Sequence, residues 1–299
     1  MEPLQRLNEI WSWLPAFRAV ADTEHLPSAS KRLCLSPPAL SRAIHLLEEA
    51  VGRKLFRKSG RRLVLEEDGR LLVEGVREGM RRIHDGLVQL EGSAFEGELR
   101  VSSAGLMTPC YVLPALKELR REHPGLRPTL TIDPPEDLVH RLLTGRLDVA
   151  FLSVPIRDAR LETKALGERT SGIYCAPGHP LFERAEVTAA DLEAQVFVTP
   201  SRIHEGWQQE GWPVDLPRQV GLQVDLMSLG VTLCKTGEYL AVLPDPVAAL
   251  EGGGRLRRLP FDLPGPIPLY AVRRPPLGGR NRVDLVLERV RALMAADVA

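Results

Sequence analysis

The chain has 299 residues, of which 44% are hydrophobic, and its 39 basic and 39 acidic side chains give a net charge of zero. This length and composition predict about two or three compact units with buried cores. No run of about 18 apolar residues is present, and the first residues lack the basic segment, apolar segment and cleavage site of a signal peptide. We therefore expect a protein that stays in the cytoplasm and does not enter a membrane.

Motifs for catalysis or metal binding are scarce. The cysteines form no CxxC pair, which argues against a zinc knuckle or a thioredoxin-like motif. There is no HExxH or GxSxG motif, and the segment LCKTG around Lys235 resembles only the end of a P-loop. We expect no catalytic activity, no metal site and no cofactor. Reduced, buried thiols are expected at Cys34, Cys110, Cys175 and Cys234.

Charge is distributed unevenly along the chain. Residues 1–65 carry eleven Lys or Arg and six Asp or Glu, a net charge of +5, which leaves −5 for the remainder. A basic block beside an acidic one suggests that the N-terminal part binds a polyanion such as nucleic acid. The alternative is a solvated basic face with no specific partner.

Two short helices are predicted near the N-terminus. The first begins at about Ser12, and it tolerates Pro15 only if that proline lies within the first turn. Residues 1–11 are then an extra N-terminal segment. The second helix is LPSASKRLC, which is followed by the turn CLS at residues 34–36.

A third helix is predicted to begin abruptly at Pro37 and Pro38. The first amides of a helix have no intrahelical partner, so prolines are tolerated there, and Ser36 is a good N-cap. One face of this helix is apolar, and the other carries polar side chains. The apolar residues are Leu40, Ile44, Leu47 and Val51; Pro38, Ser41, Arg42 and His45 lie largely opposite. Two helices joined by a short turn in this way match a helix-turn-helix.

A basic β-hairpin is predicted after the third helix. The segment LFRKSGRRLVL alternates around Ser59 and Gly60, and Lys58, Arg61 and Arg62 make its tip strongly basic. Such a wing suits DNA phosphates or the minor groove. Residues 1–66 are therefore predicted to form a winged helix-turn-helix DNA-binding domain.

Residues 17–74 resemble the DNA-binding domain of LysR-type transcriptional regulators, and the resemblance continues through most of the chain. It is carried by Ala29 and Ser30, by LSPPALSRAI from residue 35, by LLEEAVGRKLF from residue 46 and by LEEDG from residue 65. The chain departs from the family at four positions. Glycine and serine are usual where Glu24 and His25 stand, glutamine at Pro37 and threonine at Glu66.

The departure at Pro37 affects how DNA is read, because the family's glutamine commonly reaches a base edge. Ser41, Arg42 and the wing are then expected to carry more of the base readout. The predicted DNA-binding residues are Pro37, Pro38, Ser41, Arg42, His45, Lys58, Arg61 and Arg62.

Residues 67–92 are predicted to form a linker and dimerisation helix. Val76, Met80, Ile83, Leu87 and Leu90 recur at the spacing of a coiled-coil seam. Glycines at 75, 79 and 86 each cost the helix about 1 kcal/mol relative to alanine, so a packing partner is expected. The resemblance implies that this partner is the same helix of a second chain. The alternative is that the helix packs on its own domain.

Residues 97–299 alternate strands and helices, which predicts an α/β unit with a largely parallel sheet. The resemblance implies a periplasmic-binding-protein-like effector domain of two α/β subdomains. We expect subdomain I at about 97–160 and 265–299, and subdomain II at about 161–264. The predicted fold class is thus α/β with an N-terminal winged helix-turn-helix, a linker helix and this C-terminal domain.

An effector site is predicted where strands of this domain end. Ligands of such sheets bind outside the carboxyl ends of the strands, where loop amides and helix starts converge. The candidate effector-binding residues are Ser102, Ser103, Ser153, Thr199, Ser201 and Arg202. Hydroxyls and amides suit a carboxylate, and the resemblance implies that a small organic acid is one candidate effector. The alternative is that each Ser or Thr caps its own helix. The segment AGLM at 104–107 predicts a partly apolar cleft.

Together these features predict a LysR-type transcriptional regulator, not an enzyme. Its expected partners are double-stranded promoter DNA, a small-molecule effector, further copies of itself in a homodimer or homotetramer, and RNA polymerase. The alternative is a solute-binding or metabolite-carrier protein of periplasmic-binding type. That alternative fits residues 97–299, but it needs a signal peptide and leaves the basic winged domain without a role.

Overall fold

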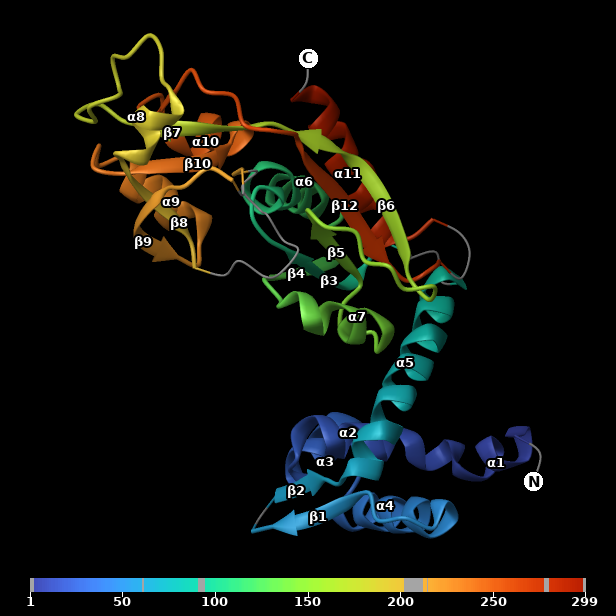
Figure 1. The fold of residues 1–299 in the computed structure, drawn as a ribbon. Helices are drawn as coiled ribbons and strands as arrows, with labels where there is room; N and C mark the ends of the chain where they lie inside the picture. The colour runs from blue at the N-terminus through green and yellow to red at the C-terminus, as the bar shows by residue number, and fades with distance from the viewer. Residues whose placement is uncertain are drawn as a thin grey trace. The chain divides into compact units, whose positions relative to one another are not determined.

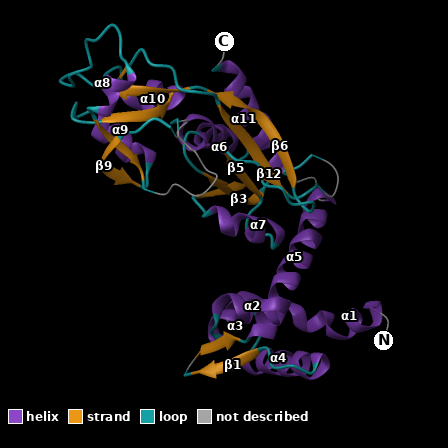
Figure 2. Cartoon of the chain, viewed as in Figure 1, coloured by secondary structure: helices purple, strands orange, loops and turns teal. Residues whose placement is uncertain are grey.

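The computed structural model describes residues 3–60, 62–90, 95–201, 212–213, 215–276 and 280–297, and it divides into two compact units (Figure 1). Unit 1 comprises residues 1–92 and unit 2 comprises residues 93–299. Unit 1 is mostly helical, whereas unit 2 contains two sheets with helices packed on them (Figure 2). Among the described helices, none combines the length and the apolar character needed to cross a membrane.

Unit 1 contains the predicted helices. Its elements are α1 (Pro3–Ile10), a 3-10 turn (Trp11–Trp13), α2 (Leu14–Thr23), α3 (Leu26–Leu33), α4 (Pro37–Val51), β1 (Phe56–Ser59), β2 (Arg62–Leu65) and α5 (Glu67–Leu90). Pro15 lies in the first turn of α2, as the sequence requires. The extra N-terminal segment forms a helix, which the sequence analysis did not predict.

Two sharp turns shape the helix-turn-helix. Glu24, which ends α2, has φ 51°, and Cys34, which ends α3, has φ 55°. Both are left-handed conformations that favour glycine. The glycine that the resemblance leads us to expect at Glu24 would adopt this backbone conformation without strain.

The core of unit 1 joins the helix-turn-helix to the beginning of α5. Phe17 and Val20 of α2 pack with Leu40 and Leu47 of α4, and all four are fully buried. Val73 of α5 belongs to the same core, as does Val76. The first half of α5 is therefore packed into the core of unit 1.

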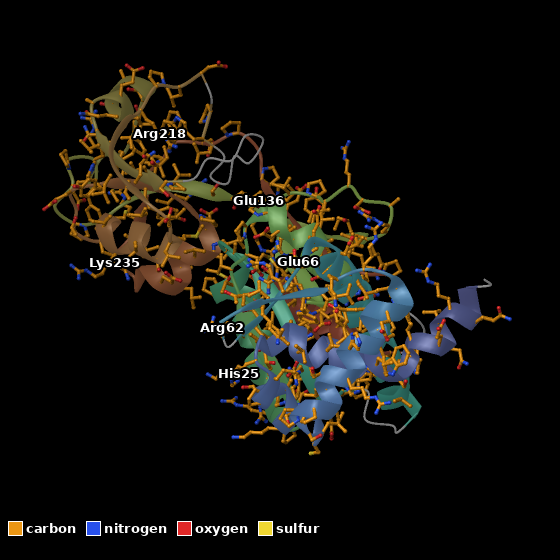
Figure 3. The ribbon with its side chains drawn as sticks, turned by 90° about the horizontal axis from the view of Figure 1, so that it is seen from below. His25, Arg62, Glu66, Glu136, Arg218 and Lys235 are labelled. Carbon is orange, nitrogen blue, oxygen red and sulfur yellow. The ribbon has the colours of Figure 1, made fainter. Side chains whose placement is uncertain are left out.

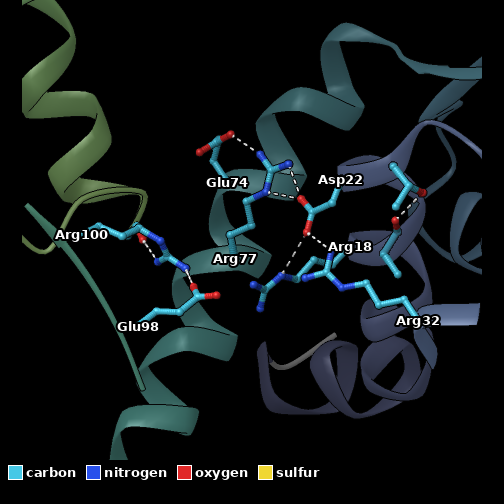
Figure 4. Close-up of polar contacts among 10 residues, drawn as sticks. Arg18, Asp22, Arg32, Glu74, Arg77, Glu98 and Arg100 are labelled. Atoms are coloured by element: carbon cyan, nitrogen blue, oxygen red, sulfur yellow. Dashed lines mark hydrogen bonds and ion pairs between the residues drawn. The ribbon is translucent and has the colours of Figure 1, made fainter. Parts of the chain in front are cut away.

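A cluster of charged side chains also holds α5 to α2 (Figure 4). The Arg77 Nε atom of α5 donates to Asp22 Oδ1 of α2 at 2.9 Å, and Arg77 Nη1 donates to Glu74 at 2.9 Å. Arg32 of α3 approaches the other Asp22 oxygen at 3.5 Å. Asp22 and Arg77 are both largely buried, so their contacts are screened less by solvent than those of a surface pair.

The first sheet of unit 2 has the strand order β4-β3-β5-β12-β6. Its strands are β3 (Gly97–Ser103), β4 (Leu126–Thr131), β5 (Val149–Leu152), β6 (Glu162–Arg169) and β12 (Ile267–Arg273). The predicted parallel pairing holds for β4, β3 and β5, whereas β12 and β6 are antiparallel to their neighbours. The sheet is therefore mixed.

Helices cover both faces of this sheet. On β5, Val149 and Phe151 enter one core, while Ala150 and Leu152 enter another with Leu142 of α7 (Pro135–Leu143). The first core also receives side chains from α6 (Leu113–Glu122) and α11 (Arg282–Ala296). A π-helical turn, Thr108–Val112, leads directly into α6.

The second sheet has the order β11-β7-β10-β8-β9. Its strands are β7 (Ser171–Cys175), β8 (Val196–Pro200), β9 (Gln219–Val224), β10 (Leu240–Pro244) and β11 (Arg257–Arg258), and its helices are α8 (Ala189–Glu193), α9 (Met227–Cys234) and α10 (Asp245–Gly252). The predicted subdomain boundary at residue 161 is wrong, because β6 pairs along its whole length with β12 of the first sheet. The chain crosses between the sheets at Thr170.

Candidate DNA interface and effector cleft

Helix α4 begins as the sequence predicts. The Ser36 hydroxyl accepts a hydrogen bond from the Ala39 amide at 3.3 Å, and Pro37 and Pro38 occupy the first turn. Both prolines are exposed. Because they have no amide hydrogen and no polar side chain, they offer only shape and apolar contact to a DNA groove.

The next turn of α4 carries the polar side chains. Ser41, Arg42 and His45 are exposed, whereas Leu40 and Leu47 are fully buried on the opposite face. His45 Nε2 lies 3.3 Å from a carboxylate oxygen of Glu49. The Arg42 side chain has no hydrogen bond or ion pair with any described residue, so its guanidinium is available to a partner.

The wing adds further cations. Residues of β1 and β2 pair directly, with Lys58 opposite Leu63 and Ser59 opposite Arg62. Lys58 and Arg62 are exposed, and Figure 3 labels Arg62 on β2. Neither side chain has a polar partner among the described residues. Arg61, also predicted to bind DNA, lies outside the described residues.

Two further cations were missed by the sequence analysis. Lys31 on α3 and Arg53, just after α4, are exposed, and the described part of the chain gives neither side chain a polar partner. Both belong to the basic block of residues 1–65, and that block was the only sequence signal for them. The exposed surface of unit 1 therefore supplies several cations for a phosphate backbone.

A cleft of about 540 Å³ lies between the two subdomains of unit 2. One side is formed by residues after β3 and β4, including Gly105, Thr108 and Asp133, and the other by the ends of β8, β9 and β10 with parts of α9 and α10. A side chain at Gly105 would lie 3.7 Å from Met227 Cε, so the two sides approach closely there. This volume lies in the range of small-molecule sites, which is about 300–1,000 Å³.

Of the predicted effector residues that the structure describes, one lines this cleft. Thr199 does so, and its side chain is 98% buried, yet its Oγ1 atom has no hydrogen-bond partner among the described residues. A buried hydroxyl without a hydrogen-bond partner costs free energy. A ligand that forms a hydrogen bond with it from the cleft would remove that cost. Thr199 is therefore the strongest single indication of a ligand.

The predicted serines contribute indirectly or not at all. The buried Ser103 accepts a hydrogen bond at 3.0 Å from Thr108, which lines the cleft, and Ser201 donates to Asp225, which also lines it. Ser102 is buried in the first sheet, and Ser153 follows β5 outside the lining. Arg202 lies outside the described residues.

The charged residues of the cleft were not predicted from the sequence. The described residues that line the cleft include three carboxylates, on Asp133, Asp225 and Glu251, and no Lys or Arg. These carboxylates are far apart in the sequence: Asp133 follows β4, Asp225 follows β9, and Glu251 lies on α10. No local motif joins them, so only the three-dimensional arrangement reveals them. The remaining lining is largely apolar. Of the AGLM segment, Ala104 and Gly105 line the cleft, whereas Leu106 and Met107 are buried in the core.

Comparison with known protein families identifies both units. The sequence model of the bacterial regulatory helix-turn-helix protein, lysR family, matches residues 11–70, and that of the LysR substrate binding domain matches residues 92–295. The chain belongs to the LysR family. It is a DNA-binding transcriptional regulator with an effector-binding domain, and the expectations of family, fold class and a non-enzymatic role are confirmed.

Relatives of this LysR-type regulator support the assignment. The SDS degradation transcriptional activation protein of Pseudomonas sp. (strain ATCC 19151) is 33% identical over 251 residues, which cover 81% of this chain and 82% of the relative. A full-length OxyR variant from Pseudomonas aeruginosa matches with a TM-score of 0.73 at 19% identity, covering 93% of this chain and 96% of that one. Full-length LysG from Corynebacterium glutamicum with bound effector Arg matches with a TM-score of 0.64 at 21% identity, covering 99% of each chain.

The predicted dimerisation seam of this LysR-type regulator divides into two parts. Val76 is 6% exposed and lies in the core of its own unit, and Met80 packs against that core. Ile83 and Leu87, by contrast, are 45% and 52% exposed. The side chain of Leu90 lies outside the described residues. The alternative of packing on its own domain therefore applies to the first part of the helix, and the apolar surface open to a second chain begins after Met80.

Three of the four thiols of this LysR-type regulator are shielded. Burial raises the pKa of Cys175 to about 11. Burial, with a smaller effect of the Asp297 and Glu251 charges, raises the pKa of Cys110 to about 12, and burial raises that of Cys234 to about 12. Cys34 is exposed and Cys110 is half-buried, which corrects the expectation that all four are buried.

Proposed function

We propose that this regulator binds promoter DNA through α4 and the wing, and that a small molecule in the cleft of unit 2 controls its binding or its activity there. The observation that carries the proposal is Thr199, a buried hydroxyl in the cleft that has no partner among the described residues. A protein that only bound DNA would have no use for a second unit with an unsatisfied cleft.

DNA binding is supported by the exposed cations of unit 1. Arg42, Lys58 and Arg62 are exposed, and no described residue neutralises them. Arginine and lysine on the recognition helix and wing are the side chains that bind base edges and phosphates. Such a protein acts in the cytoplasm beside the DNA, as a dimer or a dimer of dimers, with RNA polymerase as a further partner.

A small organic acid is less well supported as the effector than the sequence alone indicated. The described lining of the cleft offers three carboxylates and no cation, so a ligand carboxylate would meet like charges. The solute-carrier alternative is also less well supported, because it leaves the exposed cations on α4 and the wing without a role.

A genetic and footprinting experiment tests the proposal. Deletion of the gene should change the transcript levels of a small set of genes, and the purified full chain should protect part of their promoters from nuclease. The double variant Lys58→Ala, Arg62→Ala should lose this protection, whereas Arg160→Ala, which removes an exposed cation from unit 2, should retain it. A chain that protects no promoter of any affected gene would contradict the proposal.

A further inference from the structure

The carboxylates of the cleft differ in how they are already satisfied. Asp133 forms an ion pair with Arg141 of α7 and accepts a hydrogen bond from Thr131 at 2.7 Å. Asp225 accepts a hydrogen bond from Ser201. Asp133 and Asp225 are therefore both already engaged by groups of the protein itself.

Glu251 differs from the other two. It is half-buried on α10, and no described residue forms a hydrogen bond or ion pair with its carboxylate. Lys235, labelled in Figure 3, lies close by, but its ammonium group donates to the backbone carbonyl of Glu251 and not to the carboxylate. Because the described lining of the cleft carries three carboxylates and no cation, this carboxylate without a donor favours a cationic partner in the cleft.

The rest of the lining defines the body of that partner. Leu113, Leu226 and Met227 are apolar side chains on the two sides of the cleft. The buried Thr199 hydroxyl provides one further polar contact. This combination fits a molecule with an apolar chain and positively charged nitrogen groups whose hydrogens can donate to carboxylates.

We propose that the effector of this regulator is a cationic amine or guanidinium compound with a short apolar chain, held by the carboxylate of Glu251. This inference rests on the proposed role of the cleft as the effector site. It specifies the chemical class of the ligand, which the proposed role leaves open. It also replaces the organic acid that the sequence suggested.

Three probes with the same five-carbon chain test the charge preference. They are 1,5-diaminopentane, which is a dication, glutarate, which is a dianion, and 1,5-pentanediol, which is neutral. Titration calorimetry with the full chain should give a dissociation constant for the diamine about tenfold or more below those of the other two, since one charge-assisted hydrogen bond supplies about that factor.

Variants locate the binding. Glu251→Gln keeps the size of the side chain and should weaken diamine binding about tenfold, and Thr199→Val, which removes the hydroxyl but keeps the shape, should weaken it several-fold. Glu193→Gln removes an exposed carboxylate of α8 outside the cleft and should leave binding unchanged. Unchanged melting temperatures show that the variants are folded.

The outcomes separate this inference from the proposed function. Tighter binding of glutarate than of the diamine, reduced by Thr199→Val, would overturn the cationic class but keep the cleft as the effector site. Binding of none of the three probes would overturn the inference. Promoter binding is measured separately without any probe, and its absence would contradict the proposed function itself.

Discussion

Arg42 lies one turn after the two prolines that begin α4, and it is the first exposed side chain of the helix that can grip a base. Ser41 has only a hydroxyl, and His45 already lies beside Glu49. A guanidinium can bind guanine O6 and N7 together, whereas a contact with a phosphate carries no sequence information. A base contact and a phosphate contact by Arg42 therefore predict different effects of its removal on the affinity for DNA of a scrambled sequence.

Arg42→Ala is therefore expected to reduce affinity for the operator much more than for scrambled DNA, by a difference of about 1–3 kcal/mol. Fluorescence anisotropy with the two duplexes measures this difference. Lys58→Ala on the wing is the matched control, since loss of a phosphate contact should weaken both duplexes equally and reduce the salt slope by about one unit. If Arg42→Ala behaves like Lys58→Ala, then Arg42 holds a phosphate.

The thiols give a second prediction at the residue scale. Because burial raises the pKa of Cys110 and Cys234 to about 12 and that of Cys175 to about 11, their reactive thiolate is scarce at pH 8 and increases only as the pH approaches these values. Iodoacetamide at pH 8 should therefore label Cys34 first, as mass spectrometry of the peptides would show.

Unfolding in urea provides the control, because all four cysteines should then be labelled. Labelling of Cys175 or Cys234 in the folded chain as fast as that of Cys34 would contradict the prediction.

At the scale of elements, α5 has two different roles along its length. Its first half contributes Val73 and Val76 to the core of unit 1, and Arg77 binds Asp22 of α2. Its second half exposes Ile83 and Leu87. Exposed apolar side chains at coiled-coil spacing, interrupted by helix-weakening glycines, indicate a helix that requires a partner.

The double variant Ile83→Asp, Leu87→Asp should convert the protein from a dimer, or a multiple of it, to a monomer in sedimentation velocity. The reason is that two charges would be buried in the seam. Leu71→Asp is the matched control, because Leu71 is on the same helix, is 79% exposed and lies off the seam. An unchanged sedimentation coefficient in the double variant would show that the chains associate through another surface.

The elements also show what the sequence can and cannot predict. The start of α4 is local, because Ser36, Pro37 and Pro38 act on the backbone next to them, and it was predicted correctly. The assignment of β6 depends on β12, about a hundred residues later in the chain, so the predicted boundary at residue 161 was wrong. Val76 fits a dimer seam and a domain core equally well, since both have the same spacing on a helix.

At the scale of the whole molecule, the candidate DNA interface depends on local sequence, whereas the cleft of unit 2 depends on tertiary structure. The predicted DNA-binding residues lie on one hairpin and one helix, so sequence order brings them together. The cleft draws on segments from residue 104 to residue 251 and on both sheets. Of the lining residues, the sequence indicated Thr199 and, through the AGLM segment, Ala104 and Gly105. It did not indicate the three carboxylates, because their proximity depends on tertiary structure alone.

We expect this LysR-type regulator to recognise DNA through α4 and the exposed cations of unit 1. The most direct test is the affinity of the full chain for a promoter duplex and for a scrambled duplex of equal length as salt is raised. We expect log affinity to fall linearly with log salt for both, with a slope of about −0.9 per phosphate neutralised. The promoter should remain preferred by a factor of about 10³ or more. Affinity that is independent of salt, or equal for the two duplexes, would contradict the claim.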